Sequence, residues 1–153
     1  MRIRPAETGD AGGISDVLEQ LVAAGLRSNA SDKAFVLSHY IADPHRIACT
    51  VAEDGSGRIL GLQSLKRATE DNPYGVEPGW GIIGTHVSPQ AARRGIGSRL
   101  FAASREAAIA AGLRKIDATI GADNSLGLAY YEAMGFRTYR RTDSAICKCY
   151  ELP

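Results

Sequence analysis

The sequence predicts an α/β fold in which helices cover a central mixed sheet, in the order β-α-α-β-β-β-α-β-α-β-β. Two patterns carry this prediction. Apolar residues recur three and four positions apart near the start of the chain, as in a helix, and a later segment is rich in alanine and leucine, which favour helices. Other segments read as strands, where the period changes. No internal repeat or long linker divides the chain, so we expect a single domain over residues 1–153.

The first elements are an extended segment and two helices. The segment IRPA precedes a helix that is expected over residues 8–25. A second helix is expected over residues 31–42, where Ser31 or Asp32 would cap the first turn and Pro44 would stop its continuation.

Three strands come next, and the second half of the chain alternates helices with strands. Residues 46–53 and 58–67 form a predicted hairpin around the turn DGSG, and residues 80–87 form a third strand. The polar residues 68–79 between the last two strands predict a surface flap. The remaining elements are a helix over 94–111 ended by Gly112, a strand over 114–120, a helix over 124–134 ended by Gly135, and strands over 136–142 and 145–152.

The composition argues against several kinds of partner. The 18 Lys and Arg residues balance the 17 Asp and Glu residues, so the formal charge of +1 would draw the chain neither to nucleic acid nor to an anionic membrane. Cys49, Cys147 and Cys149 lack the spacing of a zinc site and the even number of a disulfide framework, which favours a reducing cytoplasm. No apolar run approaches the ~20 residues of a membrane span, and the start lacks the apolar core of a signal peptide. We expect a cytoplasmic protein.

A glycine-rich turn, QAARRGIGSRLF at residues 90–101, precedes the Ala-rich helix. A helix N-terminus exposes unpaired N–H groups and a partial positive charge, and Gly95 and Gly97 would let an anion approach this backbone closely. The turn therefore predicts a phosphate site, to which Arg93 and Arg94 would add charge. Taken alone, the glycines equally allow a plain strand-to-helix turn with solvated arginines.

Two nucleotide-binding motifs do not fit this turn. A Walker A motif, G-x-x-x-x-G-K-[ST], is absent from the chain, and the dinucleotide motif G-x-G-x-x-G needs a third glycine where Leu100 stands. Asp117, about 20 residues further on, is the one feature shared with nicotinamide-binding proteins. We expect Asp117 to pack within or beside its strand instead.

A second pattern, NSLGLAYYEAMGF at residues 124–136, places Asn124 and Tyr131 on one helix face, with Gly127 beside them and Tyr130 pointing elsewhere. This face offers an amide and a phenol to a ligand. Taken alone, the pattern favours a simpler interpretation, in which Asn124 or Asp123 caps the helix and both tyrosines pack with their hydroxyl groups at the surface.

Together the two segments resemble the GCN5-related N-acetyltransferase family. VSPQAARRGIG matches the family's V-x-P-x-x-R-G-x-G-I-G pattern without an insertion, and NSLGLAYYEAMGF matches its N-x-x-A-x-x-x-Y-x-x-x-G-F pattern. Ala92, Arg93 and Gly127 depart from the usual residues, which are Arg or Gln, Gly, and Ala. The order of elements also agrees with the family along essentially the whole chain, and the resemblance implies a mostly antiparallel sheet flanked by helices.

The resemblance implies an enzyme that transfers an acetyl group from acetyl-CoA directly to a primary amine of a small molecule or peptide. The cofactor's pyrophosphate would lie on the backbone N–H groups of residues 93–98, and its pantetheine arm would run along the strand that ends at Val87. Asn124 would contact that arm, and Tyr131 would protonate the departing sulfur. The implied cofactor-binding residues are Thr85, Val87, Arg93, Arg94, Gly95, Ile96, Gly97, Ser98, Asn124 and Gly127.

The general base has several candidates. Many members of the family carry a glutamate about four residues before the valine, where Ile83 and Gly84 stand here. His86 is the nearest titratable side chain, and an unperturbed pKa of about 6.5 would suit proton removal, although strand alternation turns it away from Val87. Ordered water or an acid of the flap could serve instead, and the flap acids are Glu70, Asp71 and Glu77.

The acceptor site of this family is built largely from the first two helices and the flap. Residues 25–35 and 69–80 are therefore candidates for substrate contact, with Tyr74 and Trp80 as walls and the flap acids as amine anchors. His39 and His45 lack metal-ligand spacing, so we expect no metal.

Other functions and an assembly stay open. A catalytically silent module that binds or senses CoA is favoured by the missing acid near Ile83, and a nicotinamide-dependent oxidoreductase would bind NADH at the glycine turn. The alternation in AICKCYEL would also allow a homodimer through a sheet edge.

Overall fold

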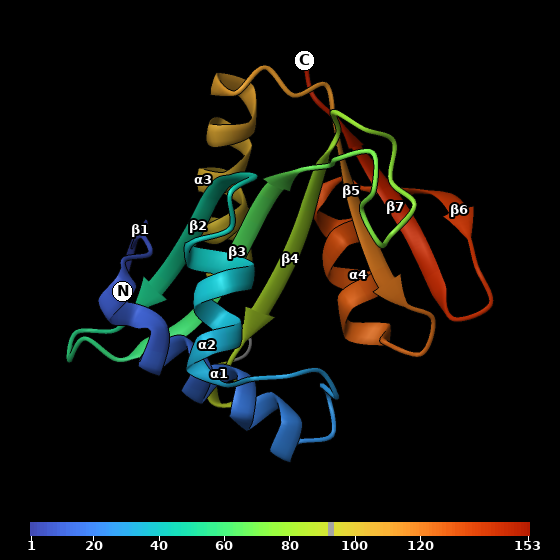
Figure 1. Ribbon diagram of the computed structural model, residues 1–153. Coiled ribbons are helices and arrows are strands. Elements are labelled where there is room, and N and C mark those ends of the chain that lie inside the picture. Colours follow the sequence, from blue (N-terminus) through green and yellow to red (C-terminus); the bar gives the residue numbers. More distant parts are fainter. Residues whose placement is uncertain (92–93) are drawn as a thin grey trace.

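The computed structural model describes residues 1–91 and 94–153 and contains a seven-stranded sheet with helices on both faces (Figure 1). The strands are β1 (Arg2–Pro5), β2 (Arg46–Glu53), β3 (Ile59–Arg67), β4 (Gly81–Val87), β5 (Lys115–Gly121), β6 (Arg137–Arg141) and β7 (Ala145–Glu151). The helices are α1 (Ala11–Ala23), α2 (Lys33–Val36), α3 (Ile96–Ala110) and α4 (Ser125–Met134), and the short helical turns are η1 (Thr8–Asp10), η2 (Leu37–Ile41) and η3 (Pro89–Ala91).

The strand order is β1-β2-β3-β4-β5-β7-β6. Every neighbouring pair is antiparallel except β4 and β5, which are parallel because the crossover helix α3 connects them. The expected mixed, mostly antiparallel sheet flanked by helices is therefore confirmed.

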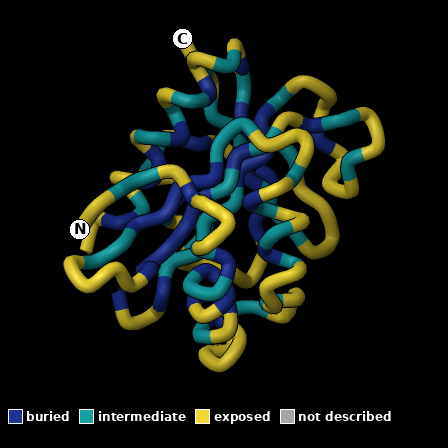
Figure 2. The backbone as a smooth tube through the Cα atoms, turned by 60° about the vertical axis from the view of Figure 1, so that its left-hand side comes forward, coloured by how far each residue is buried: buried dark blue, intermediate teal, exposed yellow. Residues whose placement is uncertain are grey.

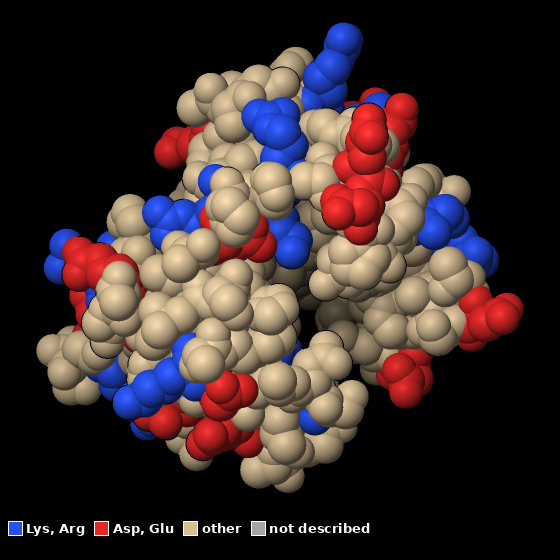
Figure 3. Space-filling view, viewed as in Figure 1, with Lys and Arg blue, Asp and Glu red and all other residues tan. Residues whose placement is uncertain are grey.

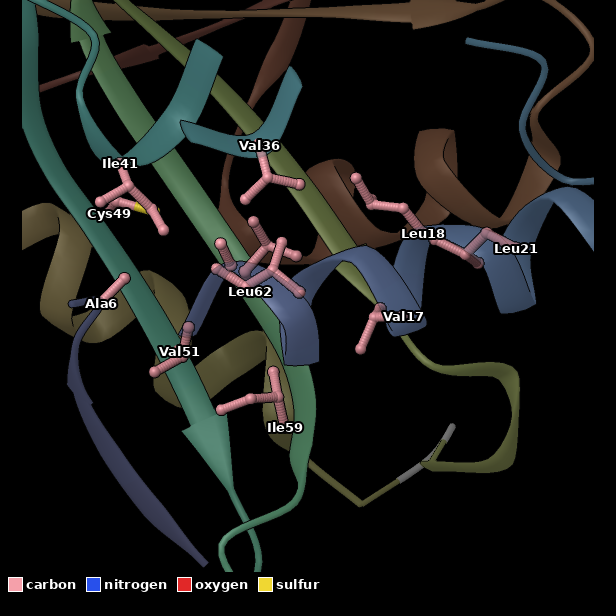
Figure 4. Close-up of a cluster of buried hydrophobic side chains, with 12 residues drawn as sticks. Ala6, Val17, Leu18, Leu21, Val36, Ile41, Cys49, Val51, Ile59 and Leu62 are labelled. Atoms are coloured by element: carbon pink, nitrogen blue, oxygen red, sulfur yellow. The ribbon is translucent and has the colours of Figure 1, made fainter. Parts of the chain in front are cut away.

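One face of the sheet is covered by α1, α2 and the β3–β4 loop. Leu62 of β3 and Val51 of β2 are fully buried against Val17 and Leu18 of α1 and Val36 of α2 (Figure 4). Ile14 and Leu21 of α1 are buried in the same cluster, so one face of this helix packs on the sheet. Figure 2 shows the buried backbone concentrated in the central strands, with exposed loops around them.

The opposite face is covered by α3 and α4. Phe136, directly after α4, is fully buried and contacts the rings of Phe101, Tyr131 and Tyr150. Because these residues come from α3, α4 and β7, Phe136 joins the C-terminal elements to the crossover helix.

Two helix boundaries differ from the sequence prediction. The second helix is α-helical only over Lys33–Val36, with Asp32 accepting a hydrogen bond from the Phe35 backbone N–H at 3.4 Å, and then continues as a π-helical turn, η2. The third helix begins at Ile96, so Arg94 lies in the turn before it. No helix in the part of the chain that the structure describes has the length and apolar character needed to span a membrane.

Phe136→Ala should destabilise the protein by about 3–5 kcal/mol, because it removes a fully buried ring and leaves a cavity. Chemical denaturation would measure this change. Leu126→Ala is the matched control: its side chain on α4 is 71% exposed, so the change should stay within about 0.5 kcal/mol. Equal effects of the two substitutions would contradict the packing described for Phe136.

Candidate active site

Strands β4 and β5 pair over a short distance and then separate. Their last paired position joins Ile82 to Asp117, although β4 continues to Val87 and β5 to Gly121. Within the described chain, the β5-facing N–H and C=O groups of β4 after Ile82 have no strand partner, and Figure 1 shows the strands diverging there. Figure 3 shows a hollow in the surface beside this separation. An extended ligand with amide groups can pair with such an edge as a further strand would.

The N-terminus of α3 lies close to the end of β4. Val87 packs in the same apolar cluster as Ile96, the first residue of the helix. Gly95 is the N-cap residue, has a φ of +71°, and provides no side-chain cap. Among the described residues no acceptor pairs with the N–H groups of residues 96–98, so these groups are available to an anion at the positive end of the helix dipole.

Charged side chains near this turn are only partly described. Arg94 is exposed, next to the exposed Gly95. Arg93 and Ala92 lie outside the described residues, so their predicted part in binding stays a prediction.

Gly97 is required by a contact within the protein. A Cβ atom at Gly97 would lie 2.5 Å from Cε1 of Tyr130. The Tyr130 hydroxyl also donates a hydrogen bond to the Gly97 carbonyl oxygen at 2.8 Å. Tyr130 thus connects α4 to the first turn of α3.

Asn124 caps α4, and this cap explains a departure from the family pattern. The Oδ1 atom of Asn124 accepts a hydrogen bond from the Gly127 backbone N–H at 2.9 Å. A Cβ atom at Gly127 would lie 2.6 Å from Nδ2 of Asn124, so glycine fits this rotamer where alanine would clash. The capping role takes the amide oxygen of Asn124 and leaves its Nδ2 group for a ligand carbonyl.

Tyr131 belongs to a buried polar network. Its hydroxyl lies 2.7 Å from Oγ1 of Thr85, and Gln63 on β3 donates from Nε2 to Thr85 Oγ1 at 2.8 Å and to the Tyr130 hydroxyl at 3.0 Å. The Oε1 atom of Gln63 is buried and has no hydrogen-bond partner among the described residues. Burial raises the pKa of Tyr131 well above its ordinary value, so its hydroxyl stays protonated at neutral pH.

Gln63 and Tyr130 were not among the residues predicted from the sequence. A glutamine within the apolar strand segment LGLQSL is a signal that could have found Gln63, since a polar residue at the centre of a buried strand requires a partner. Tyr130 gave no such signal, because its partner Gly97 is distant in the sequence.

His86 lies on the other face of β4 from Thr85, toward α2. The Tyr40 hydroxyl lies 3.3 Å from its Nε2 atom. Burial, together with the nearby charge of Arg27, lowers the pKa of His86 to about 3. A general base works best with a pKa near the working pH, so His86 is a weak candidate for that role.

Asp117 is fully buried at the last paired position of β4 and β5. Its carboxylate accepts hydrogen bonds from the Tyr139 hydroxyl at 2.5 Å and from Thr119 Oγ1 at 2.7 Å, and burial raises its pKa. Asp117 thus packs within its strand, as expected.

The flap residues 68–79 and the adjacent Trp80 contact strand β6 through a backbone carbonyl group and an aromatic ring. Arg140 on β6 donates to the Tyr74 carbonyl oxygen at 2.7 Å, and the Trp80 ring lies 5.3 Å from the Tyr139 ring. The flap acids Glu70, Asp71 and Glu77 are exposed. Within residues 1–91 and 94–153, no group of three or more His, Cys, Asp and Glu side chains is placed to hold a metal ion.

Comparisons with known proteins show a family match and related folds. The model of the acetyltransferase (GNAT) family matches residues 16–136. Mycothiol acetyltransferase of Clavibacter michiganensis subsp. michiganensis is 37% identical over 90 residues, which are 57% of this chain and 26% of the relative, so the chain spans about a quarter of that protein.

Two solved structures share the fold. A GCN5-related N-acetyltransferase from Kribbella flavida has a TM-score of 0.79 and 21% identity, with 99% of this chain and 97% of that chain covered. YncA from Salmonella typhimurium, solved with its cofactor acetyl-CoA, has a TM-score of 0.78 and 19% identity, with 99% and 94% covered. At these identities the likeness shows the fold alone.

The lowered pKa of His86 predicts that its imidazole stays neutral between pH 8 and about pH 5. In NMR titrations its Cε1–H resonance, assigned by its loss in His86→Gln, should not shift over this range. The unfolded chain takes up a proton at His86 near pH 6.5, which the folded chain resists. Wild-type stability should therefore fall as pH drops below about 6.5, and His86→Gln should lose this part of the fall. A His86 titration midpoint above pH 5 would contradict the assignment.

Proposed function

This chain belongs to the acetyltransferase (GNAT) family, and we propose that it transfers an acetyl group from acetyl-CoA directly to a primary amine of a small molecule or a peptide. Acetyltransferases of this family use acetyl-CoA as the acyl donor. The single observation that carries the proposal is the position of the Tyr131 hydroxyl. It lies against Thr85, on the stretch of β4 that has no strand partner toward β5.

The residues present fit acetyl-CoA at two separate places. The uncapped N–H groups of residues 96–98 suit a diphosphate, because they combine unpaired donors with the helix dipole. The unpaired edge of β4 up to Val87 suits the amides of a pantetheine arm. Asn124 can contact that arm through Nδ2, since its Oδ1 atom is engaged in the cap.

Acetyl-CoA supplies an acyl group already activated as a thioester. Tyr131 holds a proton on its hydroxyl oxygen and donates it to the departing sulfur, while Thr85 keeps this hydroxyl in place. A backbone N–H of β4 near Val87 donates to the thioester oxygen as negative charge develops there.

The amine must reach the site without its extra proton, because an alkylammonium with a pKa of about 10 has no free lone pair. His86 stays neutral but accepts a proton poorly at neutral pH. The exposed flap acids and ordered water stay as the other proton acceptors. A pH–rate profile of His86→Gln that matches the wild type would exclude His86 from this role.

A catalytically silent CoA-binding module is the second candidate, favoured by the weak basicity of His86 and by the apolar Ile83, which is buried in the core. Calorimetry with acetyl-CoA, followed by measurement of free CoA thiol release across a panel of amines, separates the two. Binding with thiol release that depends on the amine supports the enzyme, and binding without release supports the module. No binding at millimolar acetyl-CoA would exclude both.

Tyr131→Phe should lower kcat by about 10- to 1000-fold with little change in acetyl-CoA affinity, because it removes the proton donor and keeps the ring. Stopped-flow or steady-state thiol release would measure this. Tyr150→Phe is the control, since it also removes a hydrogen-bonded tyrosine hydroxyl. This hydroxyl belongs to a partly buried ring on β7 and accepts from Arg105. An unchanged kcat in Tyr131→Phe would remove Tyr131 from the acid role.

Thr85→Val should also lower kcat, because the Tyr131 hydroxyl loses the partner that orients it. If Thr85 acts only through Tyr131, the double variant Thr85→Val/Tyr131→Phe should be no slower than Tyr131→Phe alone. Fully additive losses in this double-mutant cycle would show that Thr85 acts independently of Tyr131.

A further inference from the structure

The loop between α1 and α2 carries an arginine whose charge the described protein does not neutralise. Arg27 donates from Nη2 to the Ala30 carbonyl oxygen at 2.8 Å, and its guanidinium lies 5.6 Å from the centre of the Phe35 ring. Its Nε atom is buried and has no hydrogen-bond acceptor among the described residues. A buried donor without a partner carries a free-energy cost, so Arg27 has both an unpaired donor and a charge without a counter-ion among the described residues.

Arg27 faces the acceptor side of the candidate site. Its Nη2 atom lies 3.5 Å from the Tyr40 hydroxyl, which in turn lies 3.3 Å from Nε2 of His86. His86 is next in sequence to Thr85, which holds the Tyr131 hydroxyl on the opposite face of β4. Arg27 is thus connected through Tyr40 to His86 of β4, the strand along which the acyl donor is proposed to lie. It lies on the face of β4 from which an amine would enter.

The surroundings of Arg27 hold no counter-charge. No Asp or Glu oxygen of the described residues lies within 4.0 Å of it, and the ion pairs of the structure use other side chains. His86 is neutral because its pKa is lowered to about 3, and burial raises the pKa of Tyr40, so that side chain is neutral too. The remaining neighbour, Phe35, is an aromatic ring.

Arg140, on the other side of the hollow, provides a contrast. It also has a buried Nε atom without an acceptor, but the Asp117 carboxyl group lies close enough to influence its pKa. Arg27 has no acid in that position. Its planar guanidinium matches the two oxygens of a carboxylate, which a lysine could not match in the same way.

We propose that the acetyl acceptor is an amine that also carries a carboxylate, and that Arg27 binds this carboxylate while the amine lies toward β4. This inference rests on the proposed function and narrows its substrate class to amino acids and related amino-carboxylic acids. Simple alkylamines, polyamines and carboxamides of amino acids would be poor acceptors.

The test compares acceptors that differ only in the carboxylate, with acetyl-CoA as donor. Suitable sets are an amino acid, its carboxamide and its decarboxylated amine, for example methionine, methioninamide and 3-(methylthio)propylamine. A longer pair, 6-aminohexanoate and hexylamine, samples a larger separation of the two groups. Within the preferred set, the wild-type kcat/KM for the carboxylate should be about 10- to 150-fold higher than for the compounds that lack it. This is the range expected for a hydrogen bond to a charged group.

Arg27→Gln should reduce this preference to near unity by lowering kcat/KM for the carboxylate alone. Its kcat/KM for the neutral amine and its acetyl-CoA affinity should stay within about twofold of the wild type. Arg114→Gln is the matched control, because Arg114 is exposed and lies before β5, away from the hollow; it should keep the wild-type preference.

A second measurement on the wild type covers the case in which Arg27→Gln fails to fold. Carboxylic acids that lack the amine should inhibit competitively against the acceptor, and their carboxamides should not. Acetylation of amines without preference for a carboxylate would overturn the inference and leave the proposed function standing. Binding of acetyl-CoA without turnover of any acceptor would overturn the proposed function, and this inference with it.

Discussion

The separation of β4 from β5 is the constraint on which the rest of the site depends. A parallel pair of strands needs a crossover, and here α3 supplies it, starting close to where β4 ends. The same connection therefore produces two features at once: an unpaired edge on β4 beyond Ile82, and an uncapped helix N-terminus at Gly95 beside the end of that edge. Backbone geometry alone thus provides one surface for amides and another for an anion, as in other folds that bind ligands at the carboxyl ends of parallel strands.

Where the pairing of β4 with β5 stops, side chains connect strands β3 and β4 to helices α4 and α3. Gln63 on β3 and Thr85 on β4 are joined to Tyr130 and Tyr131 of α4, and Tyr130 extends the connection to Gly97 of α3. Buried polar networks are costly when incomplete and rigid when complete. This network links β3 and β4 to α4 and α3 where the strand pairing stops, and within it the buried Oε1 atom of Gln63 has no partner among the described residues. The orientation of the Tyr131 hydroxyl is a product of the same arrangement.

The sequence predicted the elements well because their periodicity is local, and it predicted the site only in part because side-chain partners are not. The glycine turn before α3 and the face shared by Asn124 and Tyr131 follow from short-range spacing. Helix geometry gives the direction of Tyr130 but not its neighbour, which is Gly97 on another helix. Likewise, His86 was assigned a useful basicity from its ordinary pKa, which burial under Tyr40 and α2 removes. Enclosure by distant elements is a tertiary property, and spacing alone does not encode it.

In the proposed function, the two faces of the separated strands contact ligands by different means. On the side of α3 and α4, the proposed contacts are mainly backbone groups. Glycine in place of the family's usual alanine at residue 127 therefore affects the Asn124 cap of α4 but removes no hydrogen-bond donor. On the side of α1 and α2, recognition falls to side chains, with Arg27, Tyr40 and His86 in successive contact. Main-chain donors persist through large changes in sequence, whereas a single substitution replaces a guanidinium. The proposed acyl-donor contacts therefore depend less on side-chain identity than the proposed acceptor contacts do.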